Sequence, residues 1–183
     1  MNTKLDFSII VASTKHGGIG INNSIPWKLP TDLQFFRNVT TKTDHDTLIN
    51  AVIMGKFTWR SLPRKPLPNR INVVLSHSGD IQNSHQLGVI SAHSLDNALE
   101  KLSQIHNINK IYVIGGEKLY NEAIKHPSSK YVYMTSISAD ITCDTFFPIK
   151  DLNKYYEKIY ESDPKIDNAL HICFEEYRRI NKE

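Results

Sequence analysis

The sequence predicts a single α/β domain spanning residues 1–183, with a mostly parallel central β-sheet, flanking helices and an antiparallel C-terminal hairpin. Apolar runs of strand length alternate with helical patterns through most of the chain, which is typical of a parallel sheet with right-handed crossovers. In the C-terminal third, strand patterns follow one another without helices. The length of 183 residues, 40% of them hydrophobic, suffices for one core.

The parallel strands are expected where short apolar runs end in turn residues. These runs occupy residues 6–12 (DFSIIVA), 51–54 (AVIM), 71–75 (INVVL) and 111–114 (IYVI). They are continuous rather than alternating, so both faces of the predicted sheet should be covered. A surface loop with a short strand inside it is expected at 79–92.

Helical patterns follow the predicted strands at 31–41, 55–62, 94–104 and 117–125. Ser94 is the residue type that caps a helix N-terminus, and an apolar stripe of helical period follows it. In the C-terminal third, strands are expected within YVYMTSI, YEKIYES and LHICFEEYRRI, closing one edge of the sheet as an antiparallel hairpin.

The first predicted helix carries an aspartate where an apolar residue would be expected. Pro30 suits a first helical turn and Thr31 can cap it. Helical spacing then gives Asp32 the same face as Phe35, Phe36 and Val39. Because an unpaired buried carboxylate is costly, Asp32 should have a partner, and that partner need not be protein.

Composition excludes several function classes. The net charge of +3 comes from 22 basic and 19 acidic residues without a run, so a small anionic ligand fits better than nucleic acid. Cys143 and Cys173 show no metal-binding or disulfide spacing. No signal sequence and no apolar segment of membrane length is present, so a cytoplasmic protein without a membrane partner is expected.

Two glycine-containing junctions are candidates for binding phosphate, since open sheets bind ligands beyond the carboxyl ends of their strands. In VIGGEKLY, Gly115 and Gly116 lie between a strand and a helix N-terminus, although a tight structural turn would explain them equally well. In VIMGKFTW, Lys56 and Thr58 follow Gly55 in a first helical turn, where a lysine suggests a phosphate rather than solvent.

A third glycine cluster, HGGIGINNS at 16–24, lacks the spacing of a dinucleotide fingerprint because Asn23 occupies the last glycine position. It is interpreted as a mobile flap over a cleft, with an ordinary loop as the alternative. Arg70 is either a solvated strand end or a clamp for a carboxylate. Trp59 is expected in the core, and His77 and His93 at the surface.

Taken together, these segments resemble dihydrofolate reductase over the whole chain, in order. The segments that carry the resemblance are IVA at 10–12, GIG at 18–20, PW at 26–27, LPTDLQFF, VIMGKFTW, RINVVLS, VIGG and DTFFP. The resemblance implies NADPH-dependent reduction of 7,8-dihydrofolate by a monomer, with hydride transfer from the nicotinamide C4 to pterin C6 and protonation of N5 by water.

The family's acidic residue falls on Asp32, so the missing partner would be the pterin, whose amino group and ring N–H suit a carboxylate. The resemblance implies that Asp32, Thr135 and Trp27 are the catalytic group, with Thr135 holding the carboxylate. It implies a substrate site formed by Ile10, Asp32, Leu33, Phe36, Leu62, Leu67, Arg70 and Thr135, in which Arg70 binds the glutamate α-carboxylate.

The implied cofactor site has three parts, and no metal is implied. The nicotinamide half would contact Ala12, Gly18, Ile19, Gly20 and Ser24. The phosphates would contact Gly55, Lys56, Phe57, Thr58, Ile114, Gly115, Gly116, Glu117, Lys118, Leu119 and Tyr120. The 2′-phosphate region would involve Leu75, Ser76, His77 and His93. The family's cis peptide between two glycines is expected at Gly115–Gly116.

Many relatives carry basic side chains where this chain has His77 and His93, and Phe57 similarly lacks a charge found in some relatives. Histidines lose their charge between about pH 6 and pH 8. We therefore expect the preference for NADPH over NADH to be weaker at pH 8 than at pH 6.

Two other functions fit parts of the sequence. A non-catalytic binding module would keep the fold without the chemistry, but Asp32, Thr135 and Arg70 are all present. The related pyrimidine reductase of riboflavin synthesis shares the sheet and the cofactor mode, whereas LPTDLQFF followed by Arg70 favours folate. No fused thymidylate synthase is expected, since the chain ends shortly after the final hairpin.

Overall fold

The computed structural model describes residues 5–76 and 88–180; His77 and most of the predicted loop at 79–92 lie outside the described residues. The helices are α1 (Pro30–Thr41), α2 (Lys56–Ser61), α3 (Leu95–Ser103), α4 (Glu117–Ala123) and α5 (Ile149–Tyr155). The strands are β1 (Phe7–Thr14), β2 (Gly18–Gly20), β3 (Ile49–Gly55), β4 (Arg70–Leu75), β5 (Ile90–Ala92), β6 (Ile108–Val113), β7 (Ser129–Ile137), β8 (Thr145–Phe146), β9 (Tyr156–Glu161), β10 (Lys165–Asp167) and β11 (Leu170–Arg179).

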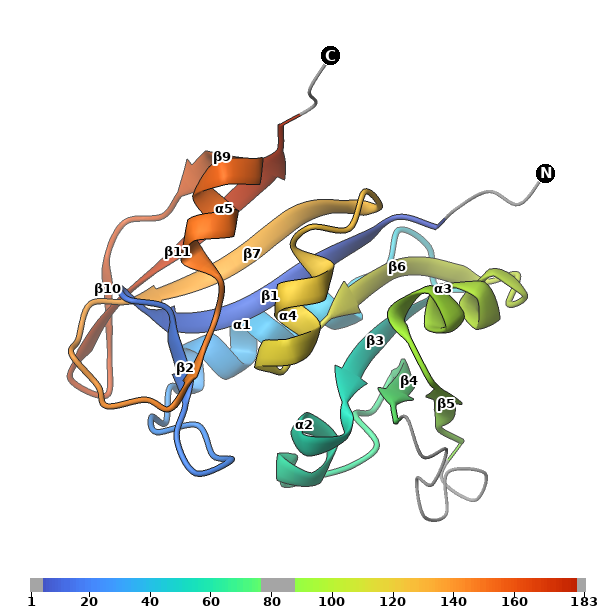
Figure 1. Ribbon diagram of the computed structural model, residues 1–183, viewed down its shortest axis with the longest axis horizontal. Coiled ribbons are helices and arrows are strands. Elements are labelled where there is room, and N and C mark those ends of the chain that lie inside the picture. Colours follow the sequence, from blue (N-terminus) through green and yellow to red (C-terminus); the bar gives the residue numbers. More distant parts are fainter. Residues whose placement is uncertain (1–4, 77–87, 181–183) are drawn as a thin grey trace.

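The main sheet has the order β10-β11-β7-β1-β6-β3-β4-β5, with β9 also paired to β11 (Figure 1). All neighbours from β7 to β5 are parallel, and β11 runs antiparallel to β7, β9 and β10. The predicted parallel sheet and antiparallel C-terminal edge are therefore confirmed. The expectation that the C-terminal third lacks a helix was wrong, because α5 precedes β9.

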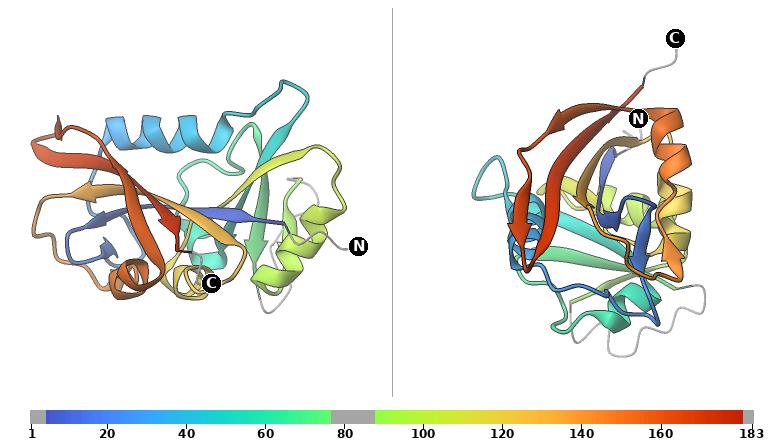
Figure 2. Two further views of the ribbon diagram at one scale, coloured as in Figure 1. Left: turned by 90° about the horizontal axis from the view of Figure 1, so that it is seen from above. Right: turned by 90° about the vertical axis from the view of Figure 1, so that its left-hand side faces the viewer.

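Helices cover both faces of the sheet, as the continuous apolar strands predict. The left view of Figure 2 shows α1 along one face and α3, α4 and α5 along the other. The larger core lies under α3, α4 and α5 and contains Leu95, Leu102 and Leu152. A smaller core lies on the α1 side, where Trp59 is buried as predicted.

Helix termini follow local capping chemistry with one exception. Ser94 caps α3 as predicted, its hydroxyl accepting the Asn97 N–H at 3.1 Å. The prediction that Thr31 caps α1 was wrong: the helix starts at Pro30, and Leu29 is the N-cap residue without a side-chain hydrogen bond. The N–H of Thr31 instead donates to Asp167 Oδ2 at 2.7 Å.

Two further sequence expectations concern thiols and membranes. Cys143 and Cys173 are both free and partly exposed. Among the described residues, no helix combines the length and the apolar character needed to cross a membrane.

Candidate active site

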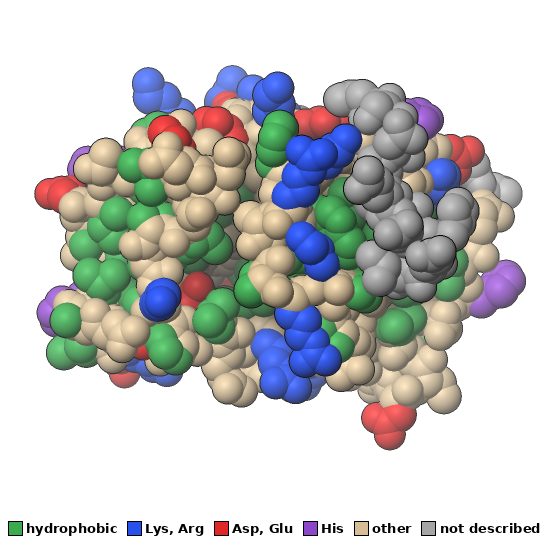
Figure 3. Space-filling model, turned by 90° about the horizontal axis from the view of Figure 1, so that it is seen from below, with side chains coloured by type: hydrophobic (Ala, Val, Ile, Leu, Met, Phe, Trp, Pro, Cys, Tyr) green, Lys and Arg blue, Asp and Glu red, His purple; other side chains and the backbone are tan. Residues whose placement is uncertain are grey.

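Residues from five strand ends meet along one edge of the sheet. Ala12 at the end of β1 pairs with Thr135 of β7, and Gly55 at the end of β3 pairs with Leu75 of β4. The N–H of Ile114, just after β6, donates to the Ile53 carbonyl of β3 at 2.9 Å. This is the edge where an open parallel sheet binds ligands. Figure 3 shows a hollow on the corresponding face, with hydrophobic side chains in it and Lys and Arg side chains along one flank.

Asp32 lies in the first turn of α1 and is half-buried. Burial raises the pKa of its carboxyl group, the hydrogen bond with Thr135 lowers it, and the negative charge of Asp167 raises it again. Thr135 is 1% exposed, so its hydroxyl is a fixed neighbour of Asp32. A carboxylate in this setting favours a ligand that offers hydrogen-bond donors.

Apolar side chains surround Asp32 on the α1 side of the sheet. Ile10 is buried, and Phe36, Leu62 and Leu67 are half-buried against the same cluster. Leu33 differs, because its side chain is 63% exposed. Trp27 is half-buried in a separate cluster formed by Leu29, Ile137, Ile172 and Phe174.

Arg70 opens β4 and is 9% exposed, so it is not a solvated strand end. Its Nε donates to the Pro68 carbonyl at 3.0 Å, and its Nη1 donates to the Thr40 hydroxyl at 2.7 Å. Burial, followed by the nearby charge of Arg37, lowers the pKa of the guanidinium group. The Thr40 hydroxyl donates in turn to the Phe36 carbonyl, which ties the orientation of Arg70 to α1.

The two predicted glycine junctions are adjacent in space. The Gly55 N–H donates to the Gly115 carbonyl at 2.8 Å, and the Gly115–Gly116 peptide is cis, as predicted. Gly115 has φ +108°, and a Cβ there would lie 2.9 Å from the Tyr120 ring. A Cβ on Gly116 would lie 3.3 Å from Thr58 Oγ1. Only glycine leaves the backbone between α2 and α4 open to a ligand.

The other residues expected to bind a cofactor fall into three groups. Phe57, Lys118 and His93 are exposed at this edge, with Lys56 partly exposed. Ser76 is 5% exposed and donates its N–H to the Ala92 carbonyl. The side chains that pack into the larger core are those of Ile19, Leu75, Leu119 and Tyr120.

The predicted flap is an ordered hairpin in this structure. Its strand β2 pairs with β8, and Ile21 and Ser24 exchange backbone hydrogen bonds of 2.9 Å. Between them Asn22 and Asn23 have φ of 50° and 57°, the left-handed region that asparagine tolerates better than most residues. This explains why an asparagine can occupy the last glycine position.

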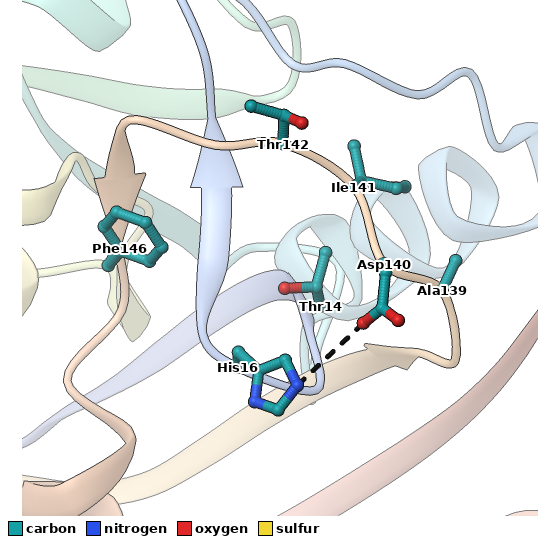
Figure 4. Close-up of a pocket in the computed structure, with 7 residues that line it drawn as sticks. All are labelled: Thr14, His16, Ala139, Asp140, Ile141, Thr142 and Phe146. Carbon is teal, nitrogen blue, oxygen red and sulfur yellow. Dashed lines mark ion pairs between the residues drawn. The ribbon is translucent and has the colours of Figure 1, made fainter.

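The flap is held by the loop between β7 and β8. Asp144 accepts the Asn22 N–H at 2.8 Å, and its own N–H donates to the Gly20 carbonyl at 2.9 Å. Glu117, expected near the phosphates, accepts the N–H of Phe146 at 3.1 Å instead. Figure 4 shows a pocket lined in part by this loop, in which the His16 ring points toward the Asp140 carboxylate at 3.9 Å.

Sequence reasoning missed three residues that organise this site: Thr40, Asp144 and Asp167. Their partners are Arg70, the flap and α1. Asp144 belongs to the segment DTFFP, which indicates the family without assigning Asp144 a role, and nothing local distinguishes Thr40 from an exposed helical threonine. Asp167 contacts a residue 136 positions earlier, so no sequence period could reveal it.

The fold and the site together define an open-sheet α/β protein with a ligand-binding edge built from a buried carboxylate, an arginine and two glycine turns. The family model described as dihydrofolate reductase matches residues 6–179. The chain is 32% identical to the dihydrofolate reductase of Heliothis virescens over 184 residues, covering 97% of this chain and all of that protein. It is 38% identical to that of Pneumocystis carinii, covering 91% of this chain and 85% of the relative.

The chain is also 38% identical to the bifunctional dihydrofolate reductase-thymidylate synthase of Daucus carota, covering 95% of this chain. It spans only about a third of the length of that relative, 34%. The family model and both kinds of relative each match nearly all of the present chain. The chain belongs to the dihydrofolate reductase family.

Proposed function

We propose that this protein reduces 7,8-dihydrofolate to 5,6,7,8-tetrahydrofolate with NADPH. The observation that carries the proposal is the half-buried Asp32, which is hydrogen-bonded to Thr135 beside an apolar wall. A pterin offers an amino group and a ring N–H side by side, and a carboxylate accepts both in a bidentate pair. The product would support one-carbon metabolism and the synthesis of thymidylate and purines in the cytoplasm.

The rest of the substrate would lie along α1 and the proline-rich corner before β4. Ile10, Leu33 and Phe36 would enclose the pterin and benzoyl rings, with Leu62 and Leu67 along the tail. The exposure of Leu33 leaves apolar area that a bound ring would cover. Arg70, already oriented by Thr40, would bind the α-carboxylate of the glutamate.

The glycine turns fit the diphosphate of a dinucleotide. A Cβ on Gly55 would face the Gly115 carbonyl and the Gly116 nitrogen at 3.8 Å, so the glycines keep this space open. Lys56, Thr58 and the start of α4 would hold the phosphates, while Ala12 and the flap would contact the nicotinamide half. NADPH supplies the hydride that reduces C6 of the pterin.

The protein's own residues orient the substrate and exclude water. Asp32 polarises the pterin from the edge far from N5, so water delivers the proton to N5. Thr135 holds the carboxylate in its bidentate orientation. The flap, held by Asp144, would keep bulk water away from the reacting carbons.

The test is the loss of reduced-nicotinamide absorbance with dihydrofolate, using NADPH and NADH, for the wild type and Asp32→Asn. Rapid NADPH-dependent turnover that collapses in the variant would support both the activity and the role of Asp32. If a well-folded wild type shows no turnover, the remaining alternatives are a non-catalytic binding module and the pyrimidine reductase. A fully active variant would contradict the role given to Asp32.

A further inference from the structure

Asp167 is a buried carboxylate that the proposed reaction does not use. It ends β10 and is 6% exposed, although aspartate is rarely buried unless it is paired. Among residues 5–76 and 88–180, no basic side chain forms an ion pair with it. Its burial therefore needs another explanation.

The hydrogen bonds of Asp167 and its neighbour point to α1. Its Oδ2 accepts the Thr31 N–H at 2.7 Å, one residue before Asp32. Pro30 has no N–H, and the N–H of Leu33 already donates to the Leu29 carbonyl. Asp167 thus binds one of the few N–H groups at the start of α1 that lack a partner within the helix.

A second set of contacts holds the same turn. Asn168 donates its Nδ2 to the Lys28 carbonyl at 2.8 Å, just before α1. Phe174 of β11 stacks on Phe35, one helical turn after Asp32, with ring centroids 4.2 Å apart. The β10–β11 hairpin therefore holds the start of α1 in place, and it does so with residues that are not part of the ligand-binding edge.

We propose that Asp167 is a positioning residue for Asp32: its buried carboxylate fixes the first turn of α1 through the N–H of Thr31 and so places a second negative charge next to Asp32. The inference rests on the proposed function, in which Asp32 orients the pterin. Aspartate satisfies both parts of this role, since it accepts the backbone N–H and carries the charge.

Two groups from other elements act on the Asp32 carboxyl group: Thr135 of β7 hydrogen-bonds it, and Asp167 of β10 repels its charge. The charge of Asp32 acts in turn on the hydroxyl group of Tyr120 in α4. Burial raises the pKa of Tyr120 first and the charge of Asp32 raises it further; its hydroxyl donates to the Ile10 carbonyl at 2.9 Å. Tyr120 therefore stays neutral while Asp32 titrates, and Asp167 is the neighbour whose charge can be changed.

The test compares Asp167→Asn, Asp167→Ala and the control Asp163→Asn. Asparagine keeps an oxygen for the Thr31 N–H but removes the charge, and alanine removes both. Asp163 is exposed in the segment between β9 and β10, so its substitution removes a nearby charge without removing a contact to α1. The readouts are the titration of the Asp32 carboxyl carbon by NMR, assigned with Asp32→Asn, and the pH profile of kcat/KM for dihydrofolate.

We expect the Asp32 midpoint to move to lower pH in Asp167→Asn and to stay unchanged in Asp163→Asn. The inflection of kcat/KM that reports Asp32 in the free enzyme should move with it. Asp167→Ala should in addition lower kcat/KM about fivefold, because the first turn of α1 also loses the hydrogen bond that holds it in place. A purely structural role would change thermal stability but leave the titration of Asp32 unchanged.

The proposal is overturned if Asp167→Asn titrates like the wild type or like Asp163→Asn. Asp167→Asn keeps the cap, so it decides the question even if Asp167→Ala does not fold. If the wild type fails to reduce dihydrofolate, the proposed function is contradicted but the role of Asp167 is not, because the NMR titration of Asp32 needs no substrate.

Discussion

At the scale of single residues, the site is organised by polar side chains buried beside apolar ones. Asp32 lies in the first turn of α1 and has the buried Thr135 as its partner. Arg70 of β4 has as its partner the buried Thr40, which lies in the last turn of α1. Buried threonines fix the side chains that they bind, because their own hydroxyl groups have few alternatives. The two charged groups are thereby oriented before any ligand binds.

Asp32→Asn should stabilise the ligand-free protein while reducing turnover at least about 100-fold. Because the pKa of Asp32 is raised in the folded state, its contribution to stability is present at low pH and is lost as pH rises through the folded pKa. An asparagine stays neutral, so the variant does not lose this stability at high pH. Its melting temperature at pH 7.5 should therefore be about 2–4 °C above that of the wild type.

Thermal melts at pH 7.5 and near pH 4 check this prediction. The gain in melting temperature should be smaller at the lower pH, because protonation makes the wild-type carboxyl group neutral, as the asparagine is. Asp163→Asn, which removes an exposed charge, is the control and should leave the melting temperature unchanged. A gain of equal size at both pH values would contradict the electrostatic explanation.

Arg70→Lys should raise KM for dihydrofolate about 10- to 100-fold with little change in kcat, because lysine cannot form a bidentate pair with a carboxylate. With a pterin substrate that lacks the glutamate tail, the KM values of the variant and the wild type should differ far less. Steady-state kinetics with both substrates measure this difference. Arg64→Lys, an exposed arginine in the same corner, is the control; an equal loss in both variants would argue against a specific clamp.

At the scale of elements, a loop and a hairpin from distant parts of the chain hold the flap and the first turn of α1. The β7–β8 loop holds the flap through Asp144, and the β10–β11 hairpin holds α1 through Asp167. Both anchors are carboxylates that accept backbone N–H groups, which gives charge-assisted hydrogen bonds. The flap and the first turn of α1 thus depend on contacts made late in the sequence.

Asp144→Ala should lower kcat/KM about tenfold, because one charge-assisted hydrogen bond holds the flap in its present position. Asp140→Ala is the matched control, since Asp140 belongs to the same loop, is exposed and lies 3.9 Å from His16 rather than against the flap backbone. Steady-state kinetics of both variants test the prediction. If the two variants behave alike, the Asp144 hydrogen bond does not control the flap.

Ala169→Gly should stabilise the protein by about 1 kcal/mol, which corresponds to about 2–4 °C in melting temperature. Ala169 has φ +64° in the two-residue turn between β10 and β11, a conformation that costs energy for any residue with a Cβ. Ala139→Gly is the control outside the left-handed region and should lower the melting temperature. Equal destabilisation of both variants would contradict a strained turn.

At the scale of the whole molecule, the sheet brings together strand ends that are far apart in the sequence. The ends of β1, β3, β4, β6 and β7 form one edge because all five strands are parallel. The proposed cofactor and substrate sites share this edge, so a ligand bound there would contact residues from several of these strands. Such a ligand should stabilise the entire fold by mass action.

NADPH at about 100 times its Kd should add about 2.7 kcal/mol to the free energy of unfolding. We expect the melting temperature to rise more with NADPH than with NADH, and this difference to be larger at pH 6 than at pH 8. The reason is the loss of positive charge from histidines near the expected 2′-phosphate position, including the exposed His93. Thermal melts of the wild type and His93→Gln measure the effect, and a difference independent of pH would contradict it.

Local sequence patterns predicted the features that depend on neighbouring residues. Apolar runs and helical periods predicted the parallel sheet and its helices, and glycines at strand ends predicted the turns at Gly55 and Gly115. The apolar face shared by Asp32, Phe35 and Phe36 predicted a carboxylate either half-buried or at the lip of an apolar cleft, and Asp32 is half-buried. All of these follow from side-chain spacing and backbone conformational limits within about ten residues.

The identity of the side chains that orient the site follows from contacts between distant parts of the chain. Thr40 reaches Arg70 across 30 residues, Asp144 reaches Asn22 across 122, and Asp167 reaches Thr31 across 136. The short strands β2 and β8 exist only because they pair with each other, and the helix α5 precedes a strand in a segment that has strand-like composition. A hydrogen bond between distant residues leaves no period in the sequence, since its partners meet only after the sheet has formed.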